Sequence, residues 1–181
     1  MHSEETRFIA VGQDLPNFAL QSVRKSDQTT FPKISKEDCK GKWTVIFTWP
    51  FDFTFVCPTE VMEFNKLYDE FDKLNCNLFG LSIDSPYVHT KWIKELGDNI
   101  KFPFLSDVKR EFAHQMGILD KNSGGTYRAT YIVDPETTIR SISINDLAVG
   151  RNPSETLRLV QAFQTGKLCG CSWKPGQATL N

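Results

Sequence analysis

The spacing of apolar residues changes along the chain, and each spacing predicts a different element. Residues 43–49, WTVIFTW, are continuously apolar or β-branched, which is typical of a strand buried on both faces. Residues 78–84, LFGLSID, show a similar run. Between these runs, apolar residues recur at helical spacing from Val61 to Leu74. We therefore expect two neighbouring buried strands joined by one helix of about four turns.

Shorter patterns predict the remaining elements. They are strands at 18–23, 29–35 and 103–107, helices at 85–97, 107–116 and 152–165, and a hairpin formed by 127–134 and 139–146. Ser85 precedes Pro86 as an N-cap, and residues 152–155 have the composition of a capping box. This order predicts an α/β fold of the thioredoxin-like type, with a mixed sheet flanked by helices and an N-terminal strand extension. We assign residues 1–165 to this domain and residues 166–181 to an extended C-terminal tail.

Composition and charge narrow the functional class. The net charge of −1 argues against nucleic acid or an anionic membrane surface as the main partner. The sequence contains no apolar run of the roughly 18 residues that a membrane span needs. The polar first residues, MHSEETRF, do not resemble a signal peptide. We therefore expect a cytoplasmic protein.

The chain has 5 cysteines at irregular spacing, an odd count that does not suggest a structural disulfide framework. In the reducing cytoplasm they are candidates for nucleophiles, redox pairs or metal ligands. Cys39 falls in a polar stretch and is expected to be a surface thiol, whereas Cys76 begins a strand and is expected to fill the core. The remaining cysteines are Cys57, Cys169 and Cys171.

A metal site is the less favoured interpretation of the Cys-x-Cys sequence in the tail. A closed zinc site needs four ligands, usually in paired spacings. The histidines that would complete it are scattered along the chain, at His2, His89 and His114. We expect neither a metal nor another cofactor.

Cys57 lies where a helix is expected to begin. Pro58 suits the first helical position, which makes Cys57 the N-cap and allows Glu60 to reach back toward its backbone N–H. A thiolate at an N-cap accepts backbone N–H groups and is stabilised by the helix dipole. The alternative is an inert cysteine that fills the helix end. Because Glu60 occupies the second position of a Cys-x-x-Cys pair, Cys57 would be a single nucleophile with a distant partner.

The residues around Cys57 carry a family resemblance. Pro50, Thr54 and Cys57 form Pro-x-x-x-Thr-x-x-Cys within the segment FTFVCPTE. Further matches are LSIDS, FPFLSD, YRATYIVD, VGRNPSETLRLVQAFQ and the tail motif Trp-Lys-Pro-Gly. The chain thus resembles, over nearly its whole length, the typical two-cysteine peroxiredoxins of the alkyl hydroperoxide reductase C type.

This resemblance implies a thiol-dependent peroxidase that reduces hydrogen peroxide and organic hydroperoxides. Cys57 would be the peroxidatic cysteine, which becomes a sulfenic acid. Pro50 would shield its sulfur from water. Thr54 would hydrogen-bond the thiolate or the peroxide, although a turn threonine that satisfies the loop backbone is an equal alternative.

Two arginines and a glutamate complete the implied site. A guanidinium in the apolar segment YRATYIVD needs a partner, so Arg128 is expected either to pair with Glu60 in a structural role or to favour charge on Cys57 and the peroxide. The resemblance favours the second role. Arg151 matches a second arginine of the family, and Glu60 would position both.

The tail is expected to supply the partner of Cys57. Cys169 matches the resolving cysteine, which in the family comes from the other subunit of a homodimer and forms a disulfide. Cys171 is an addition that resembles a bacterial Cys-x-Cys subgroup, and either cysteine can resolve or pass the disulfide on. The family implies rings of five dimers and a dithiol reductant, namely thioredoxin, an AhpF-like flavoprotein or an AhpD-like carrier. A chaperone-like holdase and a peroxide sensor remain alternative roles.

Overall fold

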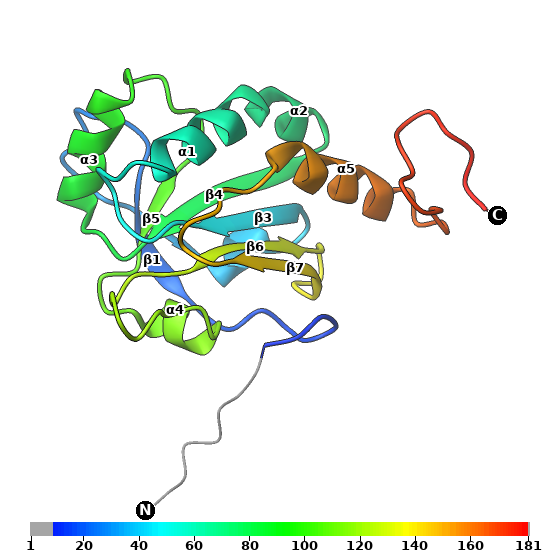
Figure 1. The fold of residues 1–181 in the computed structure, drawn as a ribbon, viewed down its shortest axis with the longest axis horizontal. Helices are drawn as coiled ribbons and strands as arrows, with labels where there is room; N and C mark the ends of the chain where they lie inside the picture. The colour runs from blue at the N-terminus through cyan, green and yellow to red at the C-terminus, as the bar shows by residue number, and fades with distance from the viewer. Residues whose placement is uncertain (1–8, 181) are drawn as a thin grey trace, which may run out of the picture.

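A computed structural model describes residues 9–180 and contains one mixed sheet (Figure 1). Its strands are β1 (Ala19–Val23), β2 (Lys33–Ser35), β3 (Trp43–Thr48), β4 (Cys76–Ser82), β5 (Phe104–Ser106), β6 (Arg128–Val133) and β7 (Ile139–Asn145). Their spatial order is β2-β1-β5-β4-β3-β6-β7. Strands β3, β4 and β5 are parallel, and the other pairs are antiparallel. The mixed sheet, its N-terminal extension β1–β2 and the β6–β7 hairpin are confirmed.

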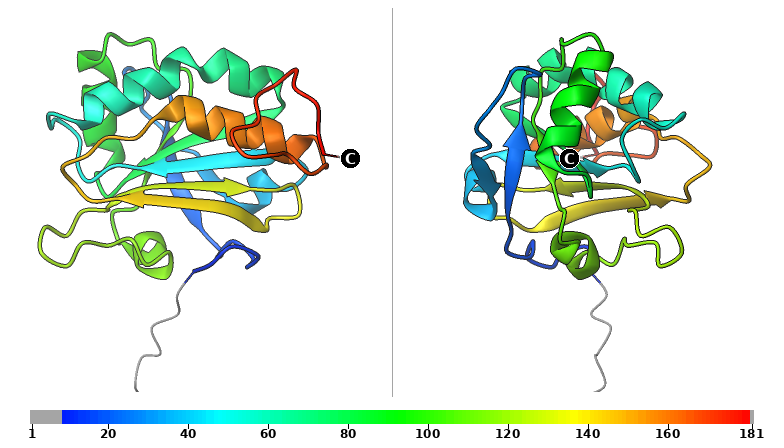
Figure 2. Two further views of the ribbon diagram at one scale, coloured as in Figure 1. Left: turned by 45° about the vertical axis from the view of Figure 1, so that its right-hand side comes forward. Right: turned by 90° about the vertical axis from the view of Figure 1, so that its left-hand side faces the viewer.

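Helices cover both faces of the sheet (Figures 1 and 2). They are η1 (Lys36–Cys39, a 3₁₀ helix), α1 (Cys57–Lys66), α2 (Tyr68–Lys73), α3 (Pro86–Glu95), α4 (Glu111–Gln115) and α5 (Pro153–Gln164). Phe64 of α1, Trp92 of α3 and Val160 of α5 belong to the core on one face. Phe112 of α4 and Cys39 of η1 belong to the core on the other. None of these helices is long and apolar enough to cross a membrane.

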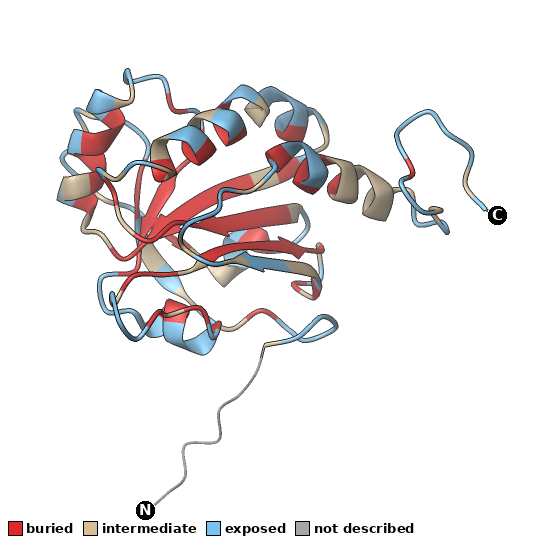
Figure 3. Cartoon of the chain, viewed as in Figure 1, coloured by how far each residue is buried: buried red, intermediate tan, exposed pale blue. Residues whose placement is uncertain are grey.

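The core lies on both faces of the central strands. All six residues of β6 are buried, and so are five of the six residues of β3 (Figure 3). This burial explains why their sequences are continuously apolar rather than alternating. The same rigid strands carry the segments that form the site described below.

The helix predicted from Val61 to Leu74 is wrong in one respect, because Leu67 divides it into α1 and α2. Leu67 has φ −90° and ψ 0°, whereas residues inside an α-helix have a ψ of about −42°. Just before it, the buried Asn65 side chain bonds Asn99 O at 3.1 Å and the Lys101 N–H at 2.8 Å. The hydrophobic spacing continues through the break because Phe64 and Phe71 pack into the same core.

The prediction that Cys39 is a surface thiol is also wrong. Helix η1 turns the polar stretch so that Cys39 is completely buried. Cys76 fills the core as expected. Burial raises the pKa of Cys39 to about 11 and that of Cys76 to about 12. Neither thiol is ionised at neutral pH.

The tail after α5 folds back instead of remaining extended (Figure 1). The Leu180 N–H donates to Leu168 O at 2.8 Å, which closes residues 168–180 into a loop. Arg158 of α5 donates from Nη1 to Trp173 O at 2.8 Å, and the Trp173 side chain is buried. The capping box predicted at the start of α5 forms only in part. The Asn152 side chain accepts the Ser154 N–H, but Glu155 pairs with Arg158.

Candidate active site

Cys57 is the first residue of α1, and the predicted N-cap position is one residue too late. Val56 is the N-cap, and its carbonyl oxygen accepts the Thr59 N–H at 3.1 Å and the Thr59 hydroxyl at 2.6 Å. These bonds start the helix earlier than Pro58 alone indicates. Cys57 still lies in the first turn, where unpaired N–H groups favour negative charge. Its side chain is buried.

The segment between β3 and Cys57 is anchored by a buried aspartate that the sequence analysis missed. The Asp52 carboxylate accepts the Trp49 indole N–H at 2.8 Å and lies 2.7 Å from His89 Nδ1. The Asp52 N–H donates to Asp84 at 2.8 Å. Burial raises the pKa of Asp52, while His89 opposes the shift. No motif signalled this contact, since Asp52 and His89 lie on segments far apart in the sequence.

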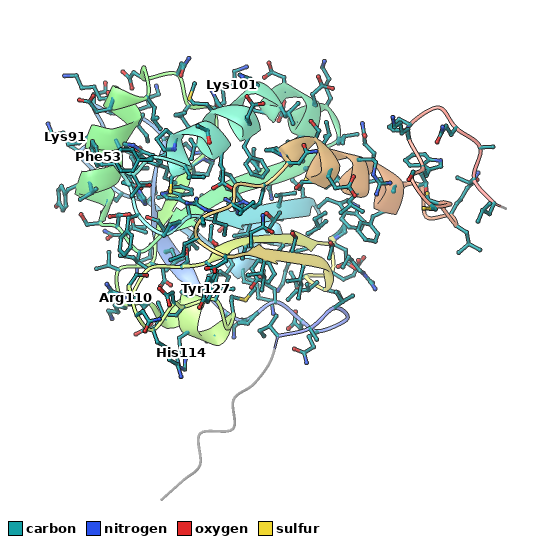
Figure 4. The ribbon with its side chains drawn as sticks, viewed as in Figure 1. Phe53, Lys91, Lys101, Arg110, His114 and Tyr127 are labelled. Atoms are coloured by element: carbon teal, nitrogen blue, oxygen red, sulfur yellow. The ribbon has the colours of Figure 1, made fainter. Side chains whose placement is uncertain are left out.

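Pro50 and Thr54 lie on this same segment. Pro50 is buried, two residues after the end of β3. Thr54 is half-buried, and its hydroxyl donates to Phe51 O at 3.1 Å. The structure thus displays the turn interaction of Thr54, the second of its two interpretations. Phe53 lies beside α3, with its ring centroid 6.4 Å from that of Trp92 (Figure 4).

Arg128 begins β6 and points toward the start of α1. Its Nη1 atom lies 3.3 Å from the Cys57 sulfur and 2.7 Å from a Glu60 oxygen. Its Nε–H donates to Leu147 O at 2.8 Å. Burial alone would lower the pKa of Arg128, but the contacts with Cys57 and Glu60 outweigh it and raise the pKa. Arg128 therefore remains a cation beside the sulfur, as required of its expected role.

Glu60 also pairs with Arg151, as expected from the sequence. Arg151 donates to the Glu60 carboxylate from Nε at 2.8 Å, from Nη2 at 2.9 Å and from its backbone N at 2.8 Å. Burial would raise the pKa of Glu60, but the two arginines lower it. The Arg151 guanidinium also stacks near Phe47 and Phe64. Glu60 is occupied by these arginines instead of reaching back toward the Cys57 N–H.

The tail cysteines lie away from this cluster. The Cys169 sulfur is 3.4 Å from Thr165 Oγ1 and 3.7 Å from Ala162 O, at the C-terminal end of α5, and Cys171 is exposed. The 12-residue helix α5 is about 18 Å long, starts just after Arg151 and ends before the tail. All 5 cysteines are free thiols.

The histidines that a metal site at the Cys-x-Cys sequence would need do not lie near the tail in the part of the chain that the structure describes. His89 is buried against Asp52, and His114 is exposed on α4 (Figure 4). His2 lies outside the described residues. Across residues 9–180, no group of three or more His, Cys, Asp or Glu side chains is arranged to hold a metal ion.

Comparison with known proteins identifies the family of this chain. Residues 11–142 match the AhpC/TSA family. The chain belongs to the AhpC/TSA family. It is 43% identical to peroxiredoxin-1 of Gallus gallus, over 94% of this chain and 89% of that protein. It is 39% identical to alkyl hydroperoxide reductase C of Mycobacterium tuberculosis H37Rv, over 96% of this chain and 94% of that protein.

Among solved structures, Enterococcus faecalis AhpC superimposes with a TM-score of 0.82 and 38% identity, covering 88% of this chain and 98% of that one. The predicted thioredoxin-like fold and the resemblance to peroxiredoxins are therefore confirmed. As an AhpC/TSA member, the protein is a peroxidase enzyme, as the sequence indicated.

Proposed function

We propose that Cys57 is the nucleophile of a thiol-dependent peroxidase that reduces hydrogen peroxide and organic hydroperoxides. The observation that carries this assignment is the 3.3 Å contact between Arg128 Nη1 and the Cys57 sulfur, at the start of a helix. The thiolate attacks one peroxide oxygen, an S–O bond forms and the O–O bond breaks. The product is the Cys57 sulfenic acid, and the second oxygen leaves as water or alcohol after protonation.

Ionisation of the thiol explains only part of the rate. A free cysteine is a few per cent thiolate at neutral pH, so complete ionisation gains only about thirtyfold. Larger gains require an oriented peroxide and donors aimed at the leaving oxygen. Arg128, Thr54 and the Cys57 N–H are the donors that we assign to this task, with Pro50 excluding water. Thr54 would exchange Phe51 O for the peroxide.

We assign resolution of the sulfenic acid to Cys169 or Cys171 of a second subunit. A disulfide needs Cα atoms within about 7 Å, whereas in this chain α5, a helix about 18 Å long, lies between Arg151 and the tail. The open edge strand β7, with Ile144 half-exposed, supports pairing with a second copy. A dithiol reductant of the thioredoxin, AhpF-like or AhpD-like kind then restores both thiols.

Three exposed aromatic side chains support further assembly of dimers into a ring. Phe53, Phe55 and Tyr87 are 54%, 98% and 70% exposed, on the segment before Cys57 and on α3. Aromatic side chains with this exposure are typical of contacts between proteins. We propose that these three side chains contribute to the contact between dimers.

Peroxide consumption by reduced protein tests the proposed activity. Wild type is expected to consume hydrogen peroxide and cumene hydroperoxide with a dithiol reductant, and Cys57→Ser is expected to consume neither. Cys76→Ser is the matched control, because Cys76 is buried but remote from Arg128. Equal consumption by wild type and Cys57→Ser would refute the assignment. A holdase role alone would instead give client protection that survives Cys57→Ser.

A further inference from the structure

The side chain of Asn145 closes the turn that orients Arg128. Asn145 is the last residue of β7 and is the cross-strand partner of Arg128 in the β6–β7 ladder. Its amide nitrogen donates to Val149 O at 3.2 Å and to Gly150 O at 3.3 Å. These two bonds join the ends of the five-residue turn at 146–150.

The turn holds an acceptor that Arg128 requires. Leu147 O accepts the Arg128 Nε–H at 2.8 Å, whereas Nη1 faces Glu60 and Cys57. The guanidinium is therefore fixed at two points on opposite sides. Arg128 is only 3% exposed, so water cannot replace Leu147 O without opening the site.

The same turn packs against the start of α1. A Cβ atom placed on Gly150 would lie 3.5 Å from Val56 Cγ1 and 3.6 Å from Glu60 Cγ. Arg151, the next residue, is held separately by Glu60 and by Ala129 O. Asn145 bears on both sides of Arg128: it closes the turn that carries Leu147 O, and it binds the carbonyl of the Gly150–Arg151 peptide group, whose N–H donates to Glu60.

We propose that Asn145 is a positioning residue for Arg128. By closing the turn, it keeps Leu147 O in place and so holds the guanidinium against the Cys57 sulfur. This inference rests on the proposed function, because it assigns Arg128 to the reacting atoms. Without Asn145, the guanidinium would pivot about its contact with Glu60.

The test compares Asn145→Ala and Asn145→Leu with Asn77→Ala. Asn77 is a matched control, since its amide also donates two bonds, to Asp38 O at 3.1 Å and Thr44 Oγ1 at 3.2 Å, at the far end of β4. We expect both Asn145 variants to lose about tenfold in the rate constant for Cys57 oxidation by hydrogen peroxide. The rate of Cys57 alkylation by iodoacetamide at pH 7 should fall. Asn77→Ala should change neither readout.

A double-variant cycle decides whether Asn145 acts through Arg128. In an Arg128→Lys background, Asn145→Ala is expected to cause no further loss of rate. An additive loss, or Asn145 variants that match Asn77→Ala in both readouts, would overturn the inference. Alkylation needs no peroxide, so it tests Asn145 even if wild type fails to reduce peroxide. That last failure would refute the proposed function instead.

Discussion

The Nη1 atom of Arg128 lies 3.3 Å from the Cys57 sulfur while donating to Glu60 at 2.7 Å. One guanidinium therefore links the candidate nucleophile to a buried carboxylate, and Arg151 binds that carboxylate from the other side. Two guanidinium cations thus share one carboxylate, which leaves one positive charge uncompensated by Glu60 beside the Cys57 sulfur.

Arg128 is expected to contribute more than ionisation of Cys57. Arg128→Met should lower the rate constant for Cys57 oxidation by about a hundredfold or more, as loss of an oriented donor does. The fraction of Cys57 alkylated at neutral pH should fall by less. Stopped-flow oxidation and iodoacetamide kinetics measure the two effects, with Arg140→Met as the control at a surface ion pair. Equal losses in both measurements would contradict the expectation.

Glu60 should make stability depend on acid. Its pKa is lowered in the folded protein, so the stabilisation is fully present above the ordinary value of 4.5 and is lost as pH falls through the lower folded value. Glu60→Gln should cost about 3 kcal/mol at pH 7, because two buried arginines lose their partner. Urea unfolding at several pH values measures this. The variant should show a weaker acid dependence than wild type, and an identical dependence would exclude Glu60 as its source.

The cysteines should divide by reactivity. Iodoacetamide at pH 8 is expected to modify Cys57, Cys169 and Cys171 in the folded protein and to leave Cys39 and Cys76 unmodified. Burial raises the pKa of Cys39 to about 11 and that of Cys76 to about 12, so neither forms enough thiolate. Peptide mass mapping measures each site. In urea all should react, and early labelling of Cys39 or Cys76 without urea would contradict their raised pKa values.

Release of the tail should speed disulfide formation. Arg158 bonds Trp173 O and is itself held by both oxygens of Glu155. Arg158→Ala removes the hydrogen bond to Trp173 O. We expect the tail cysteines then to react with a Cys57 sulfenic acid roughly fivefold faster, because the loss of one hydrogen bond of about 1 kcal/mol corresponds to a factor of this size. Quenched-flow analysis of the disulfide measures it. A rate like that of wild type would mean that the contact does not restrain the tail.

Much of the fold was predictable because its signals are local. The buried runs at β3 and β4, the proline at the start of α3 and the hairpin turn each depend on residues near one another. The break at Leu67 was not predictable, since apolar spacing continues through it and Asn65 bonds a segment over thirty residues away. Burial of Cys39 likewise depends on tertiary packing beneath a polar 3₁₀ turn.

The candidate site divides in the same way. The Pro50, Thr54 and Cys57 spacing and the need of a buried arginine for a carboxylate were visible in the sequence. Two other features were not visible in the sequence: the contact of Asp52 with His89 and the closure of a turn by Asn145. Each depends on the three-dimensional contacts of a polar side chain, and an aspartate or asparagine in the sequence does not by itself indicate such contacts.

Intact mass under non-reducing conditions, after one equivalent of hydrogen peroxide, tests the central claim most directly. Wild type should form a covalent dimer, and Cys57→Ser should remain a monomer. Comparison of Cys169→Ser, Cys171→Ser and the double variant identifies the resolving cysteine, and the double variant should retain an oxidised Cys57 without a dimer. Wild type that stays monomeric and gains no oxygen would contradict the assignment of Cys57 as the nucleophile.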